Sequence, residues 1–397
     1  MIDARSLLLR ETQAGIRGPA AGGVPGAPAA RSPIGPRPPH RIPAAWRLIA
    51  AGALTVLAAA PVGAGPETLR ERSERVIDAQ GIRSVRVENA RGLVRVTGGA
   101  GGTIRLTAIK IARAPDRERS AEFARETEVV TDLDRGDLVV RVRYPQRESM
   151  HVSLWQVFSG CELPKVEVRL GLEVPDGVRL TLTSTSGDLE TEGISGSQEL
   201  QTTSGDVTVR DARGRVDASS TSGDLEAQEI AAGRLQTVSG DVKVQGSHGA
   251  LEATSTSGDI SIGGSEDSLS LATVSGEIHA GPARRGLVAR TTSGAIVARS
   301  AAGLVRIETS SGDVSVALEN PLHRADITTG SGDIDARLGP SVGCAIEMRT
   351  SNGTLDLATP VEVRSVTRHL VTGVVNGGTA PVALRTSSGD IRVRSGE

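Results

Sequence analysis

Carboxylates recur at one fixed slot in the second half of the chain. Each follows a Ser-Gly pair, and the set is Asp188, Asp206, Asp224, Asp241, Asp259, Asp313, Asp333 and Asp390, with Glu277 in the same slot. Carboxylates stacked about 4.8 Å apart repel one another unless a cation or hydrogen-bond donors compensate them. One hypothesis is therefore a calcium-binding edge. We favour the other, in which each Asp closes its own turn by accepting backbone N–H bonds, because Ala295 and Thr354 occupy the same slot.

No other residues have the types and spacing of a catalytic or metal site. The run from Gly339 to Gly343 fits the formula G-x-S-x-G, but Pro340 stands beside Ser341 and no helical pattern follows, as a nucleophile elbow would require. The six histidines have no partner at metal-ligand spacing, and neither H-E-x-x-H nor C-x-x-C occurs. The sequence predicts a protein without catalytic residues, metal or cofactor.

The Ser-Gly-Asp phrase belongs to a repeat of about 18 residues, which is the signature of a solenoid. Val242 and Val244 flank polar Lys243, and nine residues after Val242 comes Leu251, followed by Ala253. Alternation with period two indicates strands with one buried face. Two such strands and two turns make one coil, and stacked coils pair their strands in parallel. We predict an all-β fold, a parallel β-solenoid (β-helix) that we expect to be right-handed.

One glycine marks a corner of each predicted coil. The set is Gly187, Gly205, Gly223, Gly240, Gly258, Gly276, Gly294, Gly312, Gly332, Gly353 and Gly389. We expect these glycines to adopt φ > 0, where a β-carbon would clash. The long interval between the last two is interpreted as two periods with a degenerate copy between them. Ser220 and Ser255 are expected to point inward with the apolar residues.

Solenoids of this kind include polysaccharide-modifying enzymes, which need clustered carboxylates or bases in a sugar-binding groove. Sugar grooves usually offer aromatic platforms, yet the chain has no Phe, Trp or Tyr from Asp176 to its end. The absence of aromatic residues argues against a carbohydrate-active groove on the repeats. A polysaccharide-modifying β-helix enzyme is kept as an alternative.

Residues 65–165 are predicted to form a β-rich N-terminal capping region ahead of the solenoid at residues 166–397. The polar stretch from Pro115 to Thr127 is expected to be a short helix. Residues 145–164 hold Trp155 and Phe158, and a solenoid end exposes core and strand edge that a cap must cover. We interpret this segment as a loop that plugs the N-terminal end. A loop that presents its aromatic side chains to a ligand is the alternative.

The N-terminal residues have the pattern of an export signal. Residues 1–45 have no periodicity and are predicted to be disordered or untranslated. Within residues 46–64, Arg47 precedes an apolar run that ends in a small-x-small site at Ala64, which is typical of a secretory signal peptide. An uncleaved signal anchor is the alternative and would be the only link to a membrane. We therefore expect an extracytoplasmic protein, whether periplasmic, on the cell surface or secreted.

The net charge of the chain bears on nucleic-acid binding, and its two cysteines bear on disulfide formation. The formal net charge is −2, and nucleic-acid binding needs a basic surface, so no nucleic acid is expected. Cys161 and Cys344 are the only cysteines. Because one precedes the solenoid and the other lies many coils along its axis, we expect two separate thiols rather than a disulfide.

The arrangement of strands and repeats resembles a known family. An alternating strand over residues 166–174, the turn Pro175-Asp176-Gly177, a second strand and then serial Ser-Gly-Asp phrases are similar to the bacterial putative-adhesin family of β-strand-repeat domains. Members of that family are extracytoplasmic or membrane-tethered, and most have no assigned biochemical activity. The resemblance covers about Val85 to Val393. It implies a non-enzymatic scaffold for adhesion or interaction with a protein or glycan of the cell envelope. A structural spacer or sensor ectodomain is a further alternative.

Overall fold

The computed structural model of the protein describes residues 67–114, 117–145 and 165–396, which hold 27 strands and one helix. The first elements are β1 (Glu67–Asp78), β2 (Ser84–Arg91), β3 (Val94–Gly99), β4 (Thr103–Ala114), α1 (Arg117–Glu126), β5 (Glu128–Asp134), β6 (Asp137–Arg143), β7 (Lys165–Pro175), β8 (Arg179–Ser186) and β9 (Leu189–Glu192). The middle strands are β10 (Gln198–Gln201), β11 (Val207–Ser219), β12 (Leu225–Gln236), β13 (Val242–Val244), β14 (Leu251–Thr254), β15 (Ile260–Ile262), β16 (Ser268–Ala272), β17 (Ile278–Ala280) and β18 (Gly286–Ser293). The last strands are β19 (Ile296–Ser311), β20 (Val314–Ser331), β21 (Ile334–Leu338), β22 (Cys344–Asn352), β23 (Leu355–Ala358), β24 (Glu362–Val366), β25 (Leu370–Val375), β26 (Ala380–Ser388) and β27 (Ile391–Ser395).

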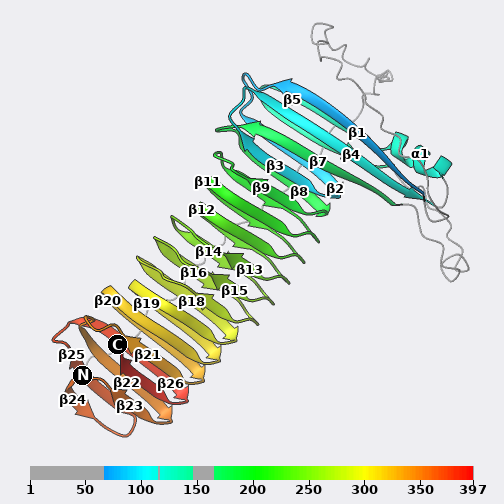
Figure 1. Cartoon of the computed structure of the whole chain (residues 1–397). Coiled ribbons are helices and arrows are strands. Elements are labelled where there is room, and N and C mark those ends of the chain that lie inside the picture. The colour runs from blue at the N-terminus through cyan, green and yellow to red at the C-terminus, as the bar shows by residue number, and fades with distance from the viewer. Residues whose placement is uncertain (1–66, 115–116, 146–164, 397) are drawn as a thin grey trace, which may run out of the picture. The chain divides into compact units, whose positions relative to one another are not determined.

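The strands form two walls that run the length of the stack of coils (Figure 1). We call the wall that follows the glycine corner the first wall, with the order β1-β4-β7-β3-β9-β11-β12-β13-β15-β17-β19-β20-β21-β27-β23. The second wall has the order β5-β6-β2-β8-β10-β11-β12-β14-β16-β18-β19-β20-β26-β22-β25-β24. The long strands β11, β12, β19 and β20 bend at a corner and contribute to both walls.

Alternation along each strand places the core between the two walls. Val242 and Val244 are 0% and 2% exposed, whereas Lys243 between them is exposed. In the opposite wall Leu251 and Ala253 are buried in the same way. Each inward residue stacks on its equivalent one coil away, as Val242 does on Ile260. The predicted all-β solenoid with two strands per coil is confirmed.

The N-terminal end of the stack contains a coil that the 18-residue repeat does not reveal. Strands β2 and β3 form a coil whose corner is Gly92, and this coil lies between β8–β9 on one side and β6 with β7 on the other. The first coil in the sequence is therefore the second in space. Its inward residues Val85, Val87, Val94 and Val96 are fully buried.

At this end, antiparallel strands extend both walls beyond the parallel stack. Strand β4 pairs antiparallel with β7 and β1, while β5 pairs antiparallel with β6. The helix α1 confirms the expected helix. Thr127 ends it by donating its backbone N–H and its hydroxyl to the carbonyl of Phe123, and the ammonium of Lys110 donates to the carbonyl of Ala124 at 2.9 Å. Ala124 packs with Ala112 and Val166 in a small separate cluster.

At the C-terminal end, too, the order of the coils in space differs from their order in the sequence. One prediction about this end was wrong. The interval between Gly353 and Gly389 holds no degenerate coil, because residues 362–375 form the antiparallel hairpin β24–β25 against β22. Strands β26 and β27 then turn back and insert between the coil of β20–β21 and the coil of β22–β23. The last coil in the sequence is the second from the end in space.

A tight crossing makes this insertion possible. Cys344 at the start of β22 pairs with Val375 on one side and Ala380 on the other, so residues 376–379 must pass across the end of β22. Asn376 and Gly377 adopt left-handed φ angles of 49° and 61°, which reverse the chain within a few residues. The amide of Asn376 donates to the carbonyl of Val342 at 3.0 Å and holds the crossing in place.

Candidate functional site

The glycines line up at one corner of successive coils. The close approach of neighbouring coils at this corner explains why glycine is required there. A β-carbon on Gly258 would overlap the carbonyl oxygen of Gly240 in the preceding coil, and the same overlap recurs along the column from Gly205 to Gly353. The expected φ > 0 is wrong for most of them, since Gly187 to Gly294 lie outside the left-handed region. Close approach between coils, rather than backbone strain, requires glycine there.

Some glycines at the ends of the column do have positive φ. Gly312, Gly332, Gly353 and Gly389 have φ between 149° and 158°, and Gly92 has φ 98°. The expected positive φ is confirmed for Gly312, Gly332, Gly353 and Gly389, whereas Gly92 was not among the glycines predicted to mark a corner. A side chain is excluded twice, because the same overlap with the neighbouring coil also applies.

A row of buried hydroxyls lies three residues before each glycine and ties neighbouring coils together. The hydroxyl of Thr273 donates to the carbonyl of Gly258 at 3.0 Å. Equivalent bonds are donated by Thr202, Ser220, Thr237, Ser255, Thr291, Thr309, Thr329, Thr350 and Thr386. The hydroxyls satisfy carbonyls at a corner that is inaccessible to water. The inward register expected for Ser220 and Ser255 is confirmed.

Thr273→Val is expected to lower the free energy of unfolding by about 1–2 kcal/mol, because the buried carbonyl of Gly258 loses its donor. The matched control is Thr256→Val, one residue before Ser257, on the exposed side of the corner. Val238 and Val274 naturally occupy that exposed slot, so we expect no measurable change. Urea unfolding of both variants is the measurement, and equal midpoints would contradict the role of the buried hydroxyl.

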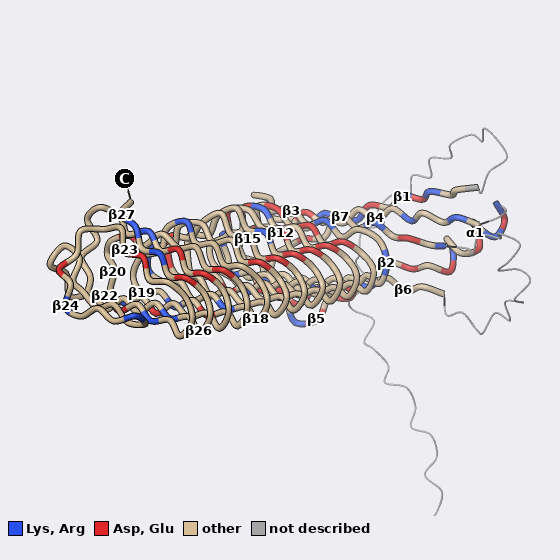
Figure 2. Tube along the Cα trace, turned by 90° about the horizontal axis from the view of Figure 1, so that it is seen from below, with Lys and Arg blue, Asp and Glu red and all other residues tan. Residues whose placement is uncertain are grey.

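The aspartates form a second row that also connects coils, which corrects the expectation that each closes its own turn. Oδ1 of Asp241 accepts the backbone N–H of Asp259 at 3.0 Å, and Oδ1 of Asp259 accepts that of Glu277 at 2.8 Å. Asp188, Asp206, Asp224, Asp313, Asp333 and Asp390 accept in the same manner. Each of these carboxylates therefore accepts a hydrogen bond from a backbone N–H of the adjacent coil. Figure 2 shows rows of acidic residues along the stack.

Basic side chains and backbone N–H groups offset the charge of this row where the structure shows partners. Arg392 lies 3.2 Å from Asp390 and 3.7 Å from Asp333. The backbone N–H of Thr354 lowers the pKa of Asp390 below its ordinary value. Among the described residues, no group of three or more His, Cys, Asp or Glu side chains is arranged to hold a metal ion.

The outer surface of the glycine corner is a ridge of hydroxyls. The two residues before each glycine are exposed almost throughout and are mostly Ser or Thr. We call the following pairs the hydroxyl ridge: Thr185–Ser186, Thr203–Ser204, Thr221–Ser222, Val238–Ser239, Thr256–Ser257, Val274–Ser275, Thr292–Ser293 and Ser310–Ser311. Backbone bonds between coils fix it, as when the N–H of Ser257 donates to the carbonyl of Val238 at 2.9 Å. The ridge therefore presents nearly the same groups at each step of about 4.8 Å.

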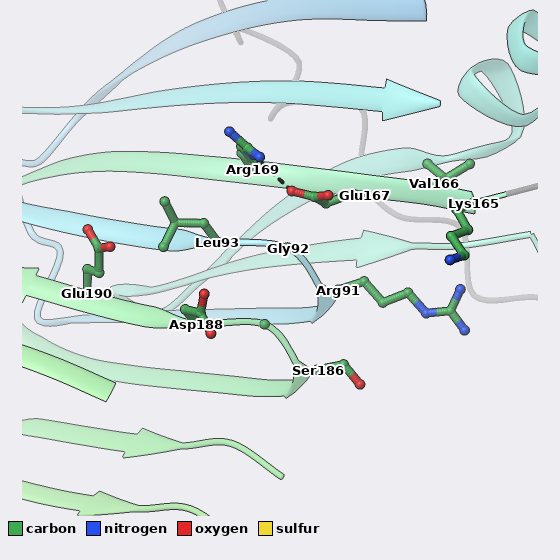
Figure 3. Close-up of a pocket in the computed structure, with 11 residues that line it drawn as sticks. Arg91, Gly92, Leu93, Lys165, Val166, Glu167, Arg169, Ser186, Asp188 and Glu190 are labelled. Carbon is green, nitrogen blue, oxygen red and sulfur yellow. Dashed lines mark hydrogen bonds and ion pairs between the residues drawn. The ribbon is translucent and has the colours of Figure 1, made fainter. Parts of the chain in front are cut away.

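A groove of about 720 Å³ opens at the N-terminal end of the glycine corner, lined by residues 91–93, the first residues of β7 and residues 186–190 (Figure 3). Its lining includes Arg91, Lys165 and Ser186, which lie on one side of the view, together with Glu167 and Asp188. Each acidic group already has a partner. Glu167 pairs with Arg169 at 2.9 Å, Glu190 pairs with Arg95, and Asp188 accepts the N–H of Asp206. The basic lining residues Arg91 and Lys165 are exposed to solvent.

Tyr144, which follows β6 directly, holds the Gly92 corner in place. Its hydroxyl lies 2.7 Å from Oδ1 of Asn89 and 2.6 Å from the carbonyl of Arg91, so one proton serves two acceptors. Asn89 in turn donates to the carbonyls of Val168 and Gly92 at 2.8 and 3.2 Å. Asn89 thus stands three residues before Gly92 in the slot that Ser and Thr occupy elsewhere. Burial raises the pKa of Tyr144 to about 12.

Tyr144 is the only tyrosine of the chain, so tyrosinate absorbance reports on it alone. We expect a titration midpoint near pH 12 in the native protein and near 10 after denaturation. Because the native pKa is the higher one, the stabilisation is complete below about pH 10 and is lost as the pH rises toward 12. Tyr144→Phe should abolish the signal. A native midpoint near 10 would contradict the buried hydroxyl.

Other residues singled out in the sequence have ordinary roles or lie outside the described ranges. Ser341 sits in the turn after β21, where its hydroxyl and carbonyl oxygens accept from the amide of Asn320 at 3.2 and 2.7 Å. The imidazole of His248 bridges Glu229 at 3.1 Å and Glu266 at 3.7 Å. Cys344 is a buried free thiol whose pKa burial raises to about 11. Trp155, Phe158 and Cys161 lie outside the described residues, as does the predicted signal segment.

The model of the Toastrack DUF4097 family matches residues 102–268 and again residues 267–394, so the two matches together span most of the chain. The chain belongs to the Toastrack DUF4097 family. The resemblance to a family of β-strand-repeat domains of unknown function is thereby confirmed. No curated protein matches the chain. None of the elements that the structure describes is a helix long and apolar enough to cross a membrane.

The chain also has a distant similarity to solved structures, three of them at 9–13% identity. A "putative cell adhesion protein" from Clostridium sporogenes ATCC 15579 shares 9% identity, with 82% of this chain and 100% of that chain covered and a TM-score of 0.20. A "putative lipid binding protein" from Parabacteroides distasonis ATCC 8503 shares 13%, with 82% and 97% covered and a TM-score of 0.33. A "putative adhesin" from Bacteroides fragilis NCTC 9343 shares 12%, with 84% and 100% covered and a TM-score of 0.25.

Proposed function

We propose that this Toastrack protein is a non-enzymatic interaction scaffold of the cell envelope, exported by its N-terminal signal and binding a protein or glycan through the hydroxyl ridge. The observation that carries the proposal is the ridge itself. Its hydroxyls are exposed, repeat coil after coil and are fixed by the ladder of glycine, hydroxyl and aspartate contacts beneath them. The surface thus recognises a partner without first being ordered.

Pre-organisation is the physical advantage of such a surface. Binding normally costs free energy to immobilise side chains and loops at the interface. Ser and Thr side chains are short, and on the ridge their backbone is already held by two neighbouring coils. Many weak hydrogen bonds in register can then add up along an extended partner, as in multivalent binding. A chain molecule with regularly spaced polar groups, whether an extended peptide or a glycan, has the matching chemistry.

The test is binding of the exported protein to envelope glycans on an array and to envelope proteins by crosslinking, with one variant that alters the ridge. The triple variant Thr203→Arg, Thr221→Arg, Thr256→Arg changes three exposed ridge positions. The control variant Thr183→Arg, Ser261→Arg, Ser270→Arg adds the same charge at exposed strand positions. We expect the ridge variant to lose at least tenfold in affinity and the control to retain binding. Equal loss in both variants would overturn the ridge as the binding surface.

Catalysis is the alternative, and the same samples address it. Parallel assays with polysaccharide substrates should show no turnover above that of the buffer. Turnover that a ridge variant leaves intact would replace the scaffold by an enzyme acting elsewhere on the chain. The absence of both binding and turnover would favour a spacer or sensor ectodomain.

A further inference from the structure

Exposed apolar side chains gather on the strands that end the two walls. Val76 on β1 and Leu133 on β5 are 57% and 56% exposed at one end of the stack. At the other end, Val363 and Val366 on β24 are 54% and 65% exposed. Few other large apolar side chains of the described residues are exposed to this extent. Apolar groups on edge strands favour contact with another sheet.

The strands β1, β5 and β24, and β23 with them, have unpaired backbone edges. In the described part of the chain, β1 pairs only with β4, β5 only with β6, β23 only with β27 and β24 only with β25. Each therefore carries a row of N–H and C=O groups available to a further strand. Strands β5 and β24 end the second wall at opposite ends, and β1 and β23 end the first. A second copy added at one end would continue both walls.

The charges of the two ends favour contact between unlike ends. Strand β5 carries Glu128, Asp132 and Asp134 and no basic residue. Strand β24 carries Arg364 beside Glu362, and Arg368 follows it. Two β5 strands pairing with each other would bring carboxylates together, and like charges directly opposite are destabilising. A two-fold pairing of β24 centred on Arg364 would likewise set that arginine against its copy.

A bulge restricts which strands can pair with the free edge of β24. The register with β25 shifts between Val363 and Ser365, which places the bulge at Arg364. Bulges and charged residues on edge strands discourage indiscriminate pairing. A partner strand must therefore complement the arginine, and Asp132 near the middle of β5 offers a carboxylate for this purpose.

We propose that the protein assembles end to end with further copies of itself, with the β24 edge of one copy pairing with the β5 edge of the next. The interface is heterologous, so the addition of each copy regenerates both ends and open chains result. The assembly multiplies the number of ridge positions presented along one axis, but it does not depend on what the ridge binds.

Sedimentation velocity of the full chain over a wide range of micromolar concentrations is the test. We expect a ladder of dimers, trimers and longer species that grows with concentration. Arg364→Glu and Asp132→Arg should each weaken association at least tenfold, and the chain carrying both substitutions should recover it. The control is Arg284→Glu, at an exposed position on the side of the stack, which should leave association unchanged. Thermal unfolding of every variant checks that each is folded.

The possible outcomes separate this assembly from its rivals. A wild-type chain that remains monomeric at every concentration overturns the proposal. A complex that stops at two copies and is indifferent to Asp132→Arg overturns it in favour of a two-fold pairing of β24. Failure of the double variant to recover association, while it remains folded, overturns the specific pairing of β24 with β5. None of these results depends on the binding assays for the ridge.

Discussion

Gly258→Ala is expected to lower the free energy of unfolding by about 3 kcal/mol, a large effect for a single methyl group. The added β-carbon would overlap the carbonyl oxygen of Gly240, which is a backbone atom held in the ladder between coils. The hydroxyl of Ser255 also lies close by, at 3.0 Å from the position of the new carbon. Neither neighbour can move without breaking bonds between coils. Denaturant melts measure the loss.

Two control substitutions separate close approach from backbone strain. Gly177→Ala adds a methyl group at φ 79° with nothing within 4 Å, so it should cost about 1–2 kcal/mol from conformation alone. Gly102→Ala has neither constraint and should be neutral or slightly stabilising. If Gly258→Ala proved no worse than Gly102→Ala, the packing of the glycine column would be wrong.

Truncation after Thr379 is expected to be more damaging still. It removes β26 and β27, whose buried residues include Val382, Leu384, Ile391 and Val393. At about 2 kcal/mol for each fully buried aliphatic side chain, the loss is on the order of 8 kcal/mol. It also leaves β20 and β22 facing a gap rather than a partner. We expect residues 332–379 to lose hydrogen-exchange protection and to be cleaved by low concentrations of protease.

The matched control is truncation after Val393, which keeps the whole inserted coil except its exposed end. This chain should behave like the intact protein in exchange and proteolysis. If β26 and β27 simply capped the end of the stack, truncation after Thr379 would remove only that coil. The hairpin β24–β25 would then remain protected. Such a result would contradict insertion of β26 and β27.

The repeat made the coil predictable, because alternation and the interval of nine residues follow directly from a strand with one buried face. The reason for the glycines was not predictable in the same way. A corner glycine looks alike in sequence whether φ or a neighbouring carbonyl demands it, and only the packing at Gly258 distinguishes the two. The same holds for Asp241, since a carboxylate can accept an N–H from its own turn or from the next coil.

The order of the coils in space could not be predicted from the sequence either. A coil inserted between two others has the same alternation of buried and exposed residues as a coil added at the end of the stack. Residues 380–393 carry an ordinary repeat, and nothing in them shows that β22 lies on one side and β20 on the other. One signal at the N-terminal end was available. Asn89 precedes Gly92 by three residues and is followed by an alternating strand, so it occupies the hydroxyl slot of a coil with an unusual corner.

An engineered disulfide tests the order of the coils most directly. Ser331 and Ser388 are register partners in neighbouring strands, and cysteines at such positions are within bridging distance. In a Cys161→Ser background, Ser331→Cys with Ser388→Cys should oxidise readily, and peptide mapping should identify the bond. Ser331→Cys with Asn352→Cys should remain reduced, because the inserted strand β26 separates them. A bond between positions 331 and 352, with none between 331 and 388, would contradict the inserted coil.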